Sequence, residues 1–356
     1  MERNEQKQSR CSCAPGGPEE QCSCPPSKPG TAEICTTDST ITFANRLDHF
    51  LARWGWKRSD HRVGPGLYRL GNPGAESPVF ASANYTLSFD ALRSALAGID
   101  AWILVLDTKG INVWCAAGKG TFGTDELVHR IESSGLATIV THRKIIVPQL
   151  GGPGVSWPDV ARKTKFLVEY GPVRARDLPE YLKTHTATPK MRRVEFPFRD
   201  RLVLTPVEFV HVVWPMIIAA AALWFLAGPV AALAAVTAVV TGTVLFPVLL
   251  PFLPAKDFSI KGLFLGAVVA LPFAFVFGTT PALPAWAAAL GAAAPLLVMP
   301  AVVGYLALNF TGCTTYTSRT GVKKEIFRYV PLMAAMAVLG SLAGILLGVS
   351  RLLGGI

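Results

Sequence analysis

Long stretches without a charged residue fill the second half of the chain. No Asp, Glu, Lys or Arg occurs within residues 209–255, 262–318 or 329–350. A membrane-spanning helix needs about 20 mainly apolar residues, so the first two stretches each have room for two such helices and the third for one. Five transmembrane helices are therefore predicted, at approximately 209–227, 230–253, 262–278, 285–308 and 329–350.

The alternative for these stretches is a set of buried helices in a soluble protein. Such helices keep a polar face, and none is visible here. Lys and Arg precede the first predicted helix and occupy the second and fourth loops, whereas the first and third loops carry no charge. The positive-inside rule then predicts a multi-pass protein of the cytoplasmic (inner) membrane, with its N-terminal half in the cytoplasm and its C-terminus outside.

The first half of the chain alternates short apolar runs with amphipathic segments from about Ile41 onward. The apolar runs predict strands at 78–83, 101–106, 137–140, 145–147 and 166–170. The intervening segments predict helices at 87–96, at 155–163, and from Thr124, a possible cap, to Gly135, a stop. Strands that alternate with helices form a mostly parallel sheet covered on both faces. We therefore expect a Rossmann-like α/β domain followed by an all-α transmembrane domain, with ligands bound beyond the carboxyl ends of the strands.

Composition divides the chain further. Residues 1–38 are rich in Pro, Gly, Ser, Glu and Cys and poor in aliphatic residues, which predicts a disordered tail. The α/β domain is expected at 39–190. Residues 191–208 mix Arg with Phe and Leu, which suits a linker at the membrane surface, although a plain linker is nearly as good a reading. The transmembrane domain is expected at 209–356.

The balance of charge says little about partners. The net charge is +10, but part of it is the basic bias of the loops, so no nucleic-acid partner is predicted. Residues 1–10 are polar and lack the apolar core of a signal peptide, which agrees with a cytoplasmic first half. Seven cysteines in that compartment make metal or cofactor chemistry the first question to ask of them.

Cys115 is the first candidate for such chemistry. Asn112 is a good N-cap and Gly118 a good residue to end a helix, so a helix of little more than one turn is expected around Cys115. Lys119 can favour the thiolate, which is the form that binds metals. On spacing alone, however, a lone cysteine is more often a small buried apolar residue.

The glycines that follow admit a second interpretation. Gly118, Gly120 and Gly123 match the dinucleotide-binding pattern, but that pattern directly follows its strand, and residues 107–117 intervene here. The next predicted strand ends without an acidic residue for a ribose, whereas Arg143 could meet the phosphate of NADP. A reductase remains a minor alternative.

The mercury-methylating corrinoid proteins have a cap-helix signature that this chain resembles at Asn112-Val-Trp-Cys-Ala-Ala-Gly-Lys119. That family is related to the large subunit of the corrinoid iron–sulfur protein of the acetyl-CoA pathway. Similarity continues through 83–90, 106–110, 120–124, 142–150 and 170–175, and it extends from about residue 41 to the end of the chain. The resemblance favours a cobalt ligand over a buried apolar residue at Cys115.

The resemblance implies a corrinoid of the cobalamin type, in its methylcobalamin form, with the Cys115 thiolate as the lower axial ligand of cobalt. The cofactor-binding residues that it implies lie on the cap helix and on the flanking loops. They are Asn84, Tyr85, Asn112, Val113, Trp114, Cys115, Ala116, Ala117, Gly118, Lys119, Gly120, Thr121, Gln149, Gly151 and Gly152. A glycine-rich loop suits the nucleotide tail, because its N–H groups can approach a phosphate closely.

The activity implied by the resemblance is transfer of a methyl group from cobalt to mercury(II), which would make the chain a corrinoid-dependent methyltransferase that acts on mercury(II) thiolates. The alternatives are a membrane-anchored methyl carrier of the acetyl-CoA-pathway type and a non-catalytic corrinoid-binding membrane protein. The chain has no cysteine pattern suited to its own iron–sulfur cluster. The expected partners are a ferredoxin-like protein with two [4Fe–4S] clusters as reductant, a methyl donor protein or methyl-folate, and the lipid bilayer.

Two further groups of cysteines lie outside the cap helix. The predicted tail holds two Cys-x-Cys pairs, and paired thiolates bind mercury(II) well, although a tail without function explains them equally. They are Cys11, Cys13, Cys22 and Cys24. Cys313 stands in a loop that resembles part of the corrinoid iron–sulfur protein, at a position where a serine is expected, so no role is assigned to it.

Overall fold

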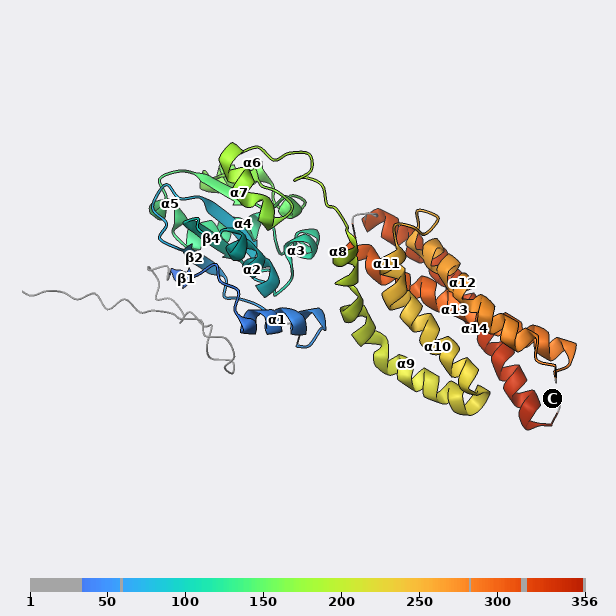
Figure 1. Cartoon of the computed structure of the whole chain (residues 1–356). Helices are drawn as coiled ribbons and strands as arrows, with labels where there is room; N and C mark the ends of the chain where they lie inside the picture. The colour runs from blue at the N-terminus through green and yellow to red at the C-terminus, as the bar shows by residue number, and fades with distance from the viewer. Residues whose placement is uncertain (1–33, 58–59, 282, 315–318, 355–356) are drawn as a thin grey trace, which may run out of the picture. The chain divides into compact units, whose positions relative to one another are not determined.

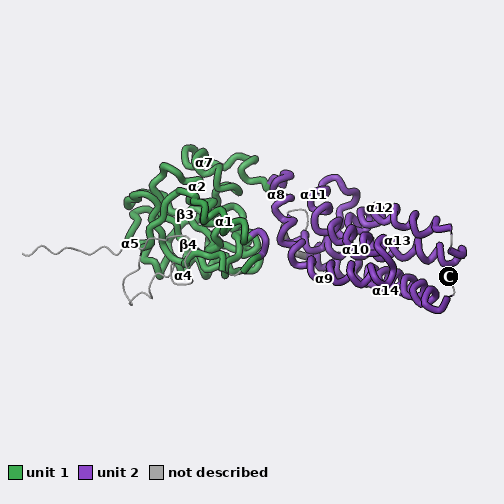
Figure 2. The backbone as a smooth tube through the Cα atoms, turned by 60° about the horizontal axis from the view of Figure 1, so that its bottom comes forward, with its two compact units in different colours: residues 1–52, 56–194 green, residues 53–55, 195–356 purple. Residues whose placement is uncertain are grey.

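A computed structural model describes residues 34–57, 60–281, 283–314 and 319–354 (Figure 1). The chain forms two compact units, coloured separately in Figure 2. Unit 1 comprises Met1–Ala52 and Trp56–Val194, and unit 2 comprises Arg53–Gly55 and Glu195–Ile356. Unit 1 contains an α/β sheet and unit 2 is helical, as the sequence predicts. The four tail cysteines proposed to bind mercury lie outside the described residues.

A six-stranded sheet forms the centre of unit 1, in the order β1-β2-β4-β3-β5-β6. All neighbouring strands are parallel except β2 and β4. The strands are β1 (Cys35–Thr37), β2 (Gly66–Leu70), β3 (Val79–Ala83), β4 (Ala101–Leu106), β5 (Lys144–Val147) and β6 (Leu167–Tyr170). The prediction of a mostly parallel sheet is therefore confirmed.

Helices cover both faces of this sheet, and each face has its own apolar core. The last residues of β3, β4 and β5 point into the core that also contains residues of α3, α4 and α6. The opposite face packs on residues of α2 and α7. The helices of unit 1 are α1 (Phe43–Arg53), α2 (Thr86–Ala95), α3 (Val113–Lys119), α4 (Thr124–Ser133), α5 (Leu136–Ile139), η1 (Gln149–Gly151), α6 (Trp157–Thr164), η2 (Ala175–Asp177) and α7 (Leu178–Thr184).

Several local predictions need correction. Residues 137–139 belong to the helical turn α5, with Val140 as its C-cap, and do not form a strand; Gly135 adopts the left-handed conformation (φ 61°) and starts this turn. Gly123, not Thr124, is the N-cap of α4. Strand β1 begins at Cys35, inside the stretch expected to be disordered, and the sequence did not predict β2 or α1.

Unit 2 contains five helical segments long and apolar enough to cross a membrane: Phe198–Ala227, Pro229–Leu249, Phe258–Gly278, Ala285–Gly312 and Thr320–Leu352. The first and fifth begin 11 and 9 residues before the predicted spans, the third begins 4 residues earlier than predicted, the fourth ends 4 residues later, and the second ends 4 residues earlier. Their elements are α8 (Phe198–Leu202), α9 (Thr205–Ala227), α10 (Pro229–Val240), η3 (Thr241–Leu245), α11 (Phe246–Leu249), α12 (Phe258–Gly278), α13 (Ala285–Ala307), η4 (Leu308–Cys313) and α14 (Arg319–Leu352).

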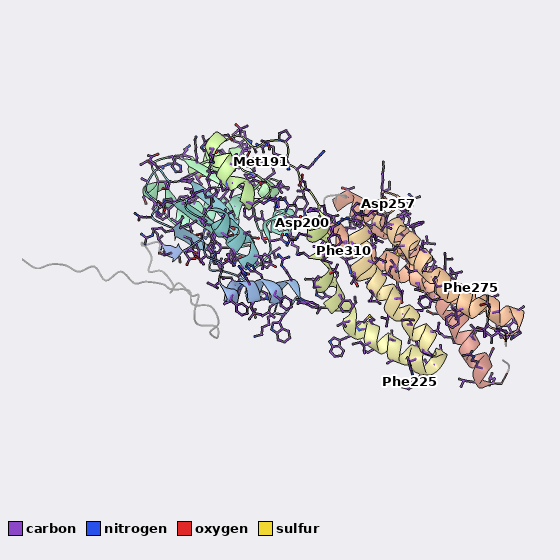
Figure 3. All side chains as sticks on the ribbon, viewed as in Figure 1. Met191, Asp200, Phe225, Asp257, Phe275 and Phe310 are labelled. Atoms are coloured by element: carbon purple, nitrogen blue, oxygen red, sulfur yellow. The ribbon has the colours of Figure 1, made fainter. Side chains whose placement is uncertain are left out.

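Small residues and aromatic rings hold unit 2 together. A Cβ on Gly262 would lie 2.6 Å from the Cα atom of Gly304, so α12 and α13 approach each other closely where neither has a side chain. Phe310 is fully buried, whereas Phe225 and Phe275 are 87% and 70% exposed (Figure 3). Exposed apolar side chains of this kind are typical of helices that cross a membrane.

Candidate functional site

The candidate site lies at the carboxyl edge of the parallel strands. In the sheet, β4 lies on one side of β3 and β5 lies on the other. The connection after β3 runs to β4, and the connection after β4 runs back across β3 to β5. The strand order therefore reverses between β3 and β5, and parallel α/β sheets bind ligands at such a point. The loop 84–86 follows β3 and the loop 148–154 follows β5. Helix α3, which follows β4, belongs to the same edge.

Asn84 organises this edge from inside the protein. It is 1% exposed, and its side-chain oxygen accepts hydrogen bonds from Thr108 N (3.1 Å), Thr108 Oγ1 (2.9 Å) and Gly110 N (3.0 Å). Its side-chain nitrogen donates to Asp107 Oδ1 (3.2 Å). Asn84, which is predicted to bind the cofactor, uses its amide to hold the loop that leads into α3.

The next residues of that loop are fixed by ionic and backbone contacts. The Lys109 ammonium donates to Asp107 Oδ2 (2.6 Å), and Glu126 of α4 accepts the backbone N–H of Asp107 (2.8 Å). Burial raises the pKa of Asp107, but the hydrogen bonds from Lys109 and the positive charges of Lys109 and Arg130 outweigh it and hold the pKa below its ordinary value. Lys109 itself has a φ of 60°, in the left-handed region. The loop is therefore fixed before α3 begins.

Helix α3 begins as predicted and ends later. Asn112 is its N-cap, and its side chain accepts the backbone N–H of Cys115 (2.9 Å). The helix continues through Gly118 and ends at Gly120, which has a φ of 87° and closes the last turn. Gly118 therefore does not end the helix, which corrects that prediction.

The two sides of α3 have different environments. Val113, Ala116 and Ala117 are buried in the core against the sheet. Trp114 and Cys115 are half-buried, and Cys115 is a free thiol. The last three residues of the segment, Gly118, Lys119 and Gly120, are exposed. The sequence identifies this helix, but only the structure separates its packed positions from its accessible ones.

Beneath α3, two glycine loops pack against each other with almost no space between them. A Cβ on Gly154 would overlap the carbonyl oxygen of Phe122 and lie 3.1 Å from the Cα atom of Ala117. A Cβ on Gly151 would lie 2.5 Å from the Phe122 ring. Gly123 is closed off in the same way by the carbonyl oxygen of Gly120 (2.6 Å). These glycines are required by the packing of the chain itself.

The remaining predicted residues lie at the edges of these loops. Gln149 accepts a hydrogen bond from Arg192 through its side-chain oxygen (2.6 Å), and Gly151 is buried. Gly152, Tyr85 and Thr121 are half-buried. The structure thus brings α3 and both loops together, but it divides the predicted residues into structural and accessible ones.

The glycines above the packed floor have open space around them. A Cβ on Gly118 or Gly120 would meet no atom within 4 Å. Gly120 needs its positive φ, but Gly118 is helical, and a glycine there costs roughly 1 kcal/mol relative to alanine. Nothing in the described packing requires that cost. A group that approaches the backbone at Gly118 would explain it.

The site has few groups that could hold a metal by themselves. Among residues 34–57, 60–281, 283–314 and 319–354, no group of three or more His, Cys, Asp or Glu side chains is arranged to bind an ion. A single thiol suits an ion that other ligands already hold, as in a metal-containing organic cofactor. The run Gly118-x-Gly120-x-x-Gly123 begins inside α3 rather than directly after a strand, which disfavours the dinucleotide interpretation.

Functional positions that the sequence did not indicate are those that support the site. Thr108, Glu126 and Phe122 fix the loop and the floor. Thr108 and Phe122 lie in segments that carry the resemblance, 106–110 and 120–124, but nothing in the sequence indicates what their side chains contact. Gly154 ends a visible glycine cluster, Gly151-Gly-Pro-Gly154, and this cluster was the available signal.

Comparison with known proteins gives matches to one group. The family model of the CO dehydrogenase/acetyl-CoA synthase delta subunit matches residues 56–155. Acetyl-CoA decarbonylase/synthase complex subunit gamma of Methanopyrus kandleri is 34% identical over 128 residues, which cover 35% of this chain and 27% of the relative. Subunit gamma 2 of Methanosarcina mazei is 35% identical over 130 residues, with the same coverage. Subunit gamma of Methanocaldococcus jannaschii is 30% identical over 130 residues, 36% of this chain and 26% of the relative.

These matches correct the family predicted from the sequence. They name subunits of acetyl-CoA decarbonylase/synthase and not a mercury-methylating protein. The chain spans about a quarter of the length of the curated relatives it matches. The family-model match contains β2 to β5, α3 and the loops of the candidate site, and it ends before the apolar helices.

Proposed function

We propose that the chain is a membrane-anchored corrinoid protein that carries a methyl group, of the type that serves the acetyl-CoA pathway. The observation that carries this proposal is the position of Cys115. Its free, half-buried thiol lies on a short helix at the carboxyl edge of the sheet, within the segment that matches subunits of acetyl-CoA decarbonylase/synthase. Transfer to mercury(II) is not part of this proposal.

The residues of the site fit a corrinoid in a defined way. A bound corrinoid supplies a cobalt ion that can take up and release a methyl group. The Cys115 thiolate would be the ligand from the protein, because a soft thiolate suits a polarizable transition metal. The open backbone at Gly118 and Gly120 would let a large planar group lie close to α3. Trp114 and Lys119 would border it.

The other residues act by holding Cys115 in place. Asn112 fixes the first turn of α3 through the backbone N–H of Cys115. Asn84 holds the loop before that helix, and the packed glycines hold the floor below it. Position matters because a ligand displaced by even 1 Å loses much of its effect. In this proposal Asn84 and Gly151 act as positioning residues for Cys115.

The proposal includes partners that supply what the described residues lack. A corrinoid would need its cobalt in the Co(I) state to take up a methyl cation, so a centre lost to oxidation would need a reductant, and the described residues contain no group of three or more His, Cys, Asp or Glu that could hold a cluster. We propose a small iron–sulfur protein of the ferredoxin type as the reductant, and a methyl-folate or a methyl donor protein as the source of the methyl group. Unit 2 would hold unit 1 at the cytoplasmic face of the membrane, with the C-terminus outside.

Spectroscopy of the loaded protein tests the ligand. The full chain in detergent would be loaded with hydroxocobalamin, and its absorption spectrum would be compared with those of Cys115→Ala and Cys35→Ala. We expect wild type and Cys35→Ala to share the spectrum of sulfur-ligated cobalt, and Cys115→Ala to lose it. The same cobalt ligation in wild type and Cys115→Ala would exclude Cys115 as the ligand, and no retained cofactor in any of the three would exclude a corrinoid protein.

A further inference from the structure

Helix α1 is amphipathic, and its apolar side is the exposed one. A helix turns by about 100° per residue, so Phe43, Leu47 and Phe50 of α1 fall within about 60° of one another on one side, and Trp54 follows directly after the helix, where it is grouped with unit 2. These four side chains are 81%, 48%, 54% and 40% exposed. The opposite side carries Asn45, Asp48, His49 and Ala52, and of these Ala52 is buried. The apolar side of α1 thus faces away from unit 1.

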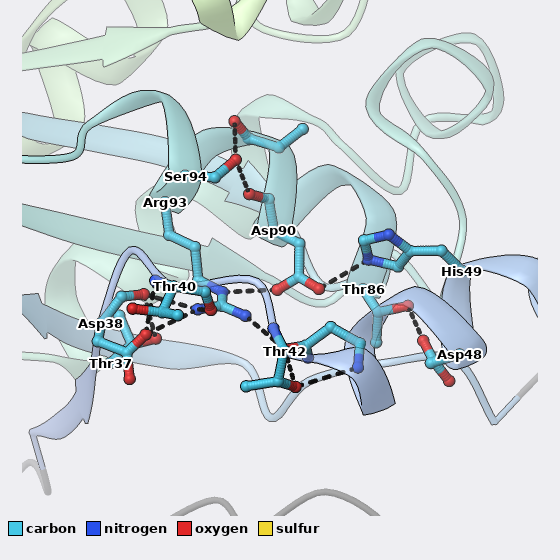
Figure 4. A network of polar contacts seen from close by, with 12 residues as sticks. Thr37, Asp38, Thr40, Thr42, Asp48, His49, Thr86, Asp90, Arg93 and Ser94 are labelled. Atoms are coloured by element: carbon cyan, nitrogen blue, oxygen red, sulfur yellow. Dashed lines mark hydrogen bonds and ion pairs between the residues drawn. The ribbon is translucent and has the colours of Figure 1, made fainter.

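Polar contacts fix this orientation (Figure 4). Asp48 accepts a hydrogen bond from Thr86 Oγ1 (2.7 Å) and lies 2.6 Å from Nδ1 of the buried His61. His49 Nε2 lies 2.7 Å from Asp90 Oδ2, and Asp90 is itself 2.6 Å from Nε of Arg93.

The second half of the network anchors the start of α1. Arg93 donates to Asn45 Oδ1 (3.2 Å) and to the backbone oxygen of Thr40 (2.8 Å). Asp90 and Arg93 are 4% and 6% exposed. A rotation of α1 that buried its apolar side would break the bonds of Asn45, Asp48 and His49 and remove partners from the buried Asp90 and Arg93, which would keep only their mutual ion pair and the contacts to residues before α1. The exposed apolar stripe is therefore built into the fold of unit 1.

We propose that α1 is an interfacial helix that binds unit 1 to the surface of the bilayer. The stripe formed by Phe43, Leu47, Phe50 and Trp54 would enter the boundary between headgroups and acyl chains. Helices of this kind combine a large apolar side with Trp, Phe and Leu and with basic residues at its border. This inference rests on the membrane anchoring proposed above, and it does not depend on the cofactor.

Charge complementarity favours an anionic lipid surface as the partner. Arg46 and Arg53 lie on the same edge of the apolar stripe, and Lys57 and the exposed Trp56 follow the helix. Basic residues near anionic headgroups are attracted to them, and tryptophan is enriched at the interface of membranes. Because the same chain contains five apolar spans, unit 1 is held near a bilayer and needs no high intrinsic affinity for it.

Binding of α1 would also affect the candidate site. Thr86, which bonds to Asp48, is the first residue of α2 and ends the loop 84–86 at the edge of the site. The backbone N–H of Thr86 also donates to the oxygen of His61. A bilayer that holds α1 would therefore restrain this loop through two short connections.

Photo-cross-linking in proteoliposomes tests the proposal. The full chain would carry p-benzoylphenylalanine at Leu47, in vesicles of phosphatidylglycerol and phosphatidylcholine, and adducts would be identified by mass spectrometry. The matched control is His129, which is exposed on α4 outside the stripe. We expect lipid adducts at position 47 and none at position 129. Loss of one Arg at an anionic surface weakens attraction by about fivefold, so Arg46→Gln should lower the adduct yield at Leu47 by up to about that factor.

A third labelled position separates the two proposals. Phe225 is exposed on α9, within a predicted span. Lipid adducts at position 225 without adducts at 47, or adducts from 47 to peptides of unit 2 or of a second copy, would overturn the interfacial helix and leave the anchoring intact. An absence of lipid adducts at position 225 would overturn the membrane anchoring itself.

Discussion

Two sets of glycines lie within one small region of unit 1 and have opposite surroundings. Gly123, Gly151 and Gly154 are pressed against backbone or ring atoms, whereas Gly118 and Gly120 have open space around them. Packing against the rest of the chain accounts for glycine at the first set of positions. At the second set, and at Gly118 above all, no contact within the described chain requires a glycine. The comparison teaches that a glycine-rich segment contains both a structural floor and a surface for a ligand.

Gly154→Ala should give the largest effect, because it tests the floor. The new methyl group would overlap the backbone oxygen of Phe122 and press on Ala117, and backbone atoms cannot move aside as a flexible side chain can. Overpacking of this kind costs about 3 kcal/mol. Urea titration of the full chain in detergent, followed by near-UV circular dichroism, measures the loss. Gly74→Ala is the control, since a Cβ there meets no atom within 4 Å; equal effects at both positions would contradict the packed floor.

Asn84→Ala should have the next largest effect. Like Gly154→Ala, it tests a residue that supports the structure of the site. The variant leaves Thr108 N and Gly110 N buried without their acceptor, at a cost of about 2 kcal/mol. The same urea titration measures it. Asn72, whose side chain is exposed, provides the control variant Asn72→Ala, which should stay near wild type. If corrinoid loading fell in Asn84→Ala while stability did not, Asn84 would contact the cofactor after all.

The extent to which the sequence predicts this fold depends on how strongly each element is patterned. Strand β4 occupies 101–106 as predicted, because six consecutive buried apolar residues leave little freedom of interpretation. The strand predicted at residues 137–140 was wrong, because an apolar run of four fits a strand or a helical turn equally well. The sheet could be predicted, but its short and ambiguous pieces could not.

The candidate site shows a different limit. Asn112 was identified as the N-cap because its role depends on residues close to it in sequence. The role of Asn84 depends on Thr108 and Gly110, more than twenty positions away, so its buried amide could be mistaken for a ligand contact. Gly118 and Gly154 look alike in the sequence, and only the neighbours brought by the fold distinguish them.

Gly118→Ala tests the glycines that have open space around them. Unlike the two variants above, it should raise the stability of the folded protein. Alanine is a better helix former, and nothing in the described chain opposes its methyl group, so stability should rise by about 0.5–1 kcal/mol. Binding of hydroxocobalamin should nevertheless weaken, because the methyl group would occupy the space that the cofactor needs. Urea titration and retention of the cofactor on gel filtration measure the two effects. A variant more stable than wild type that binds equally well would show that the space at Gly118 serves no ligand.

The smallest expected effect concerns the pH dependence of stability that Asp107 contributes. The pKa of Asp107 is lowered in the folded protein, below the value of about 3.9 that an unfolded chain would have. A lowered pKa adds stability above about pH 4, and that stability is lost as the pH falls through the folded value. Because Lys109 is 68% exposed, the contribution should stay below about 1 kcal/mol. Asp90, whose pKa is lowered by His49 and Arg93 although burial raises it, should keep part of the acid sensitivity in Asp107→Asn. We therefore expect Asp107→Asn to lose less stability than wild type on acidification, and a greater loss in the variant would contradict the role of the Lys109 contact.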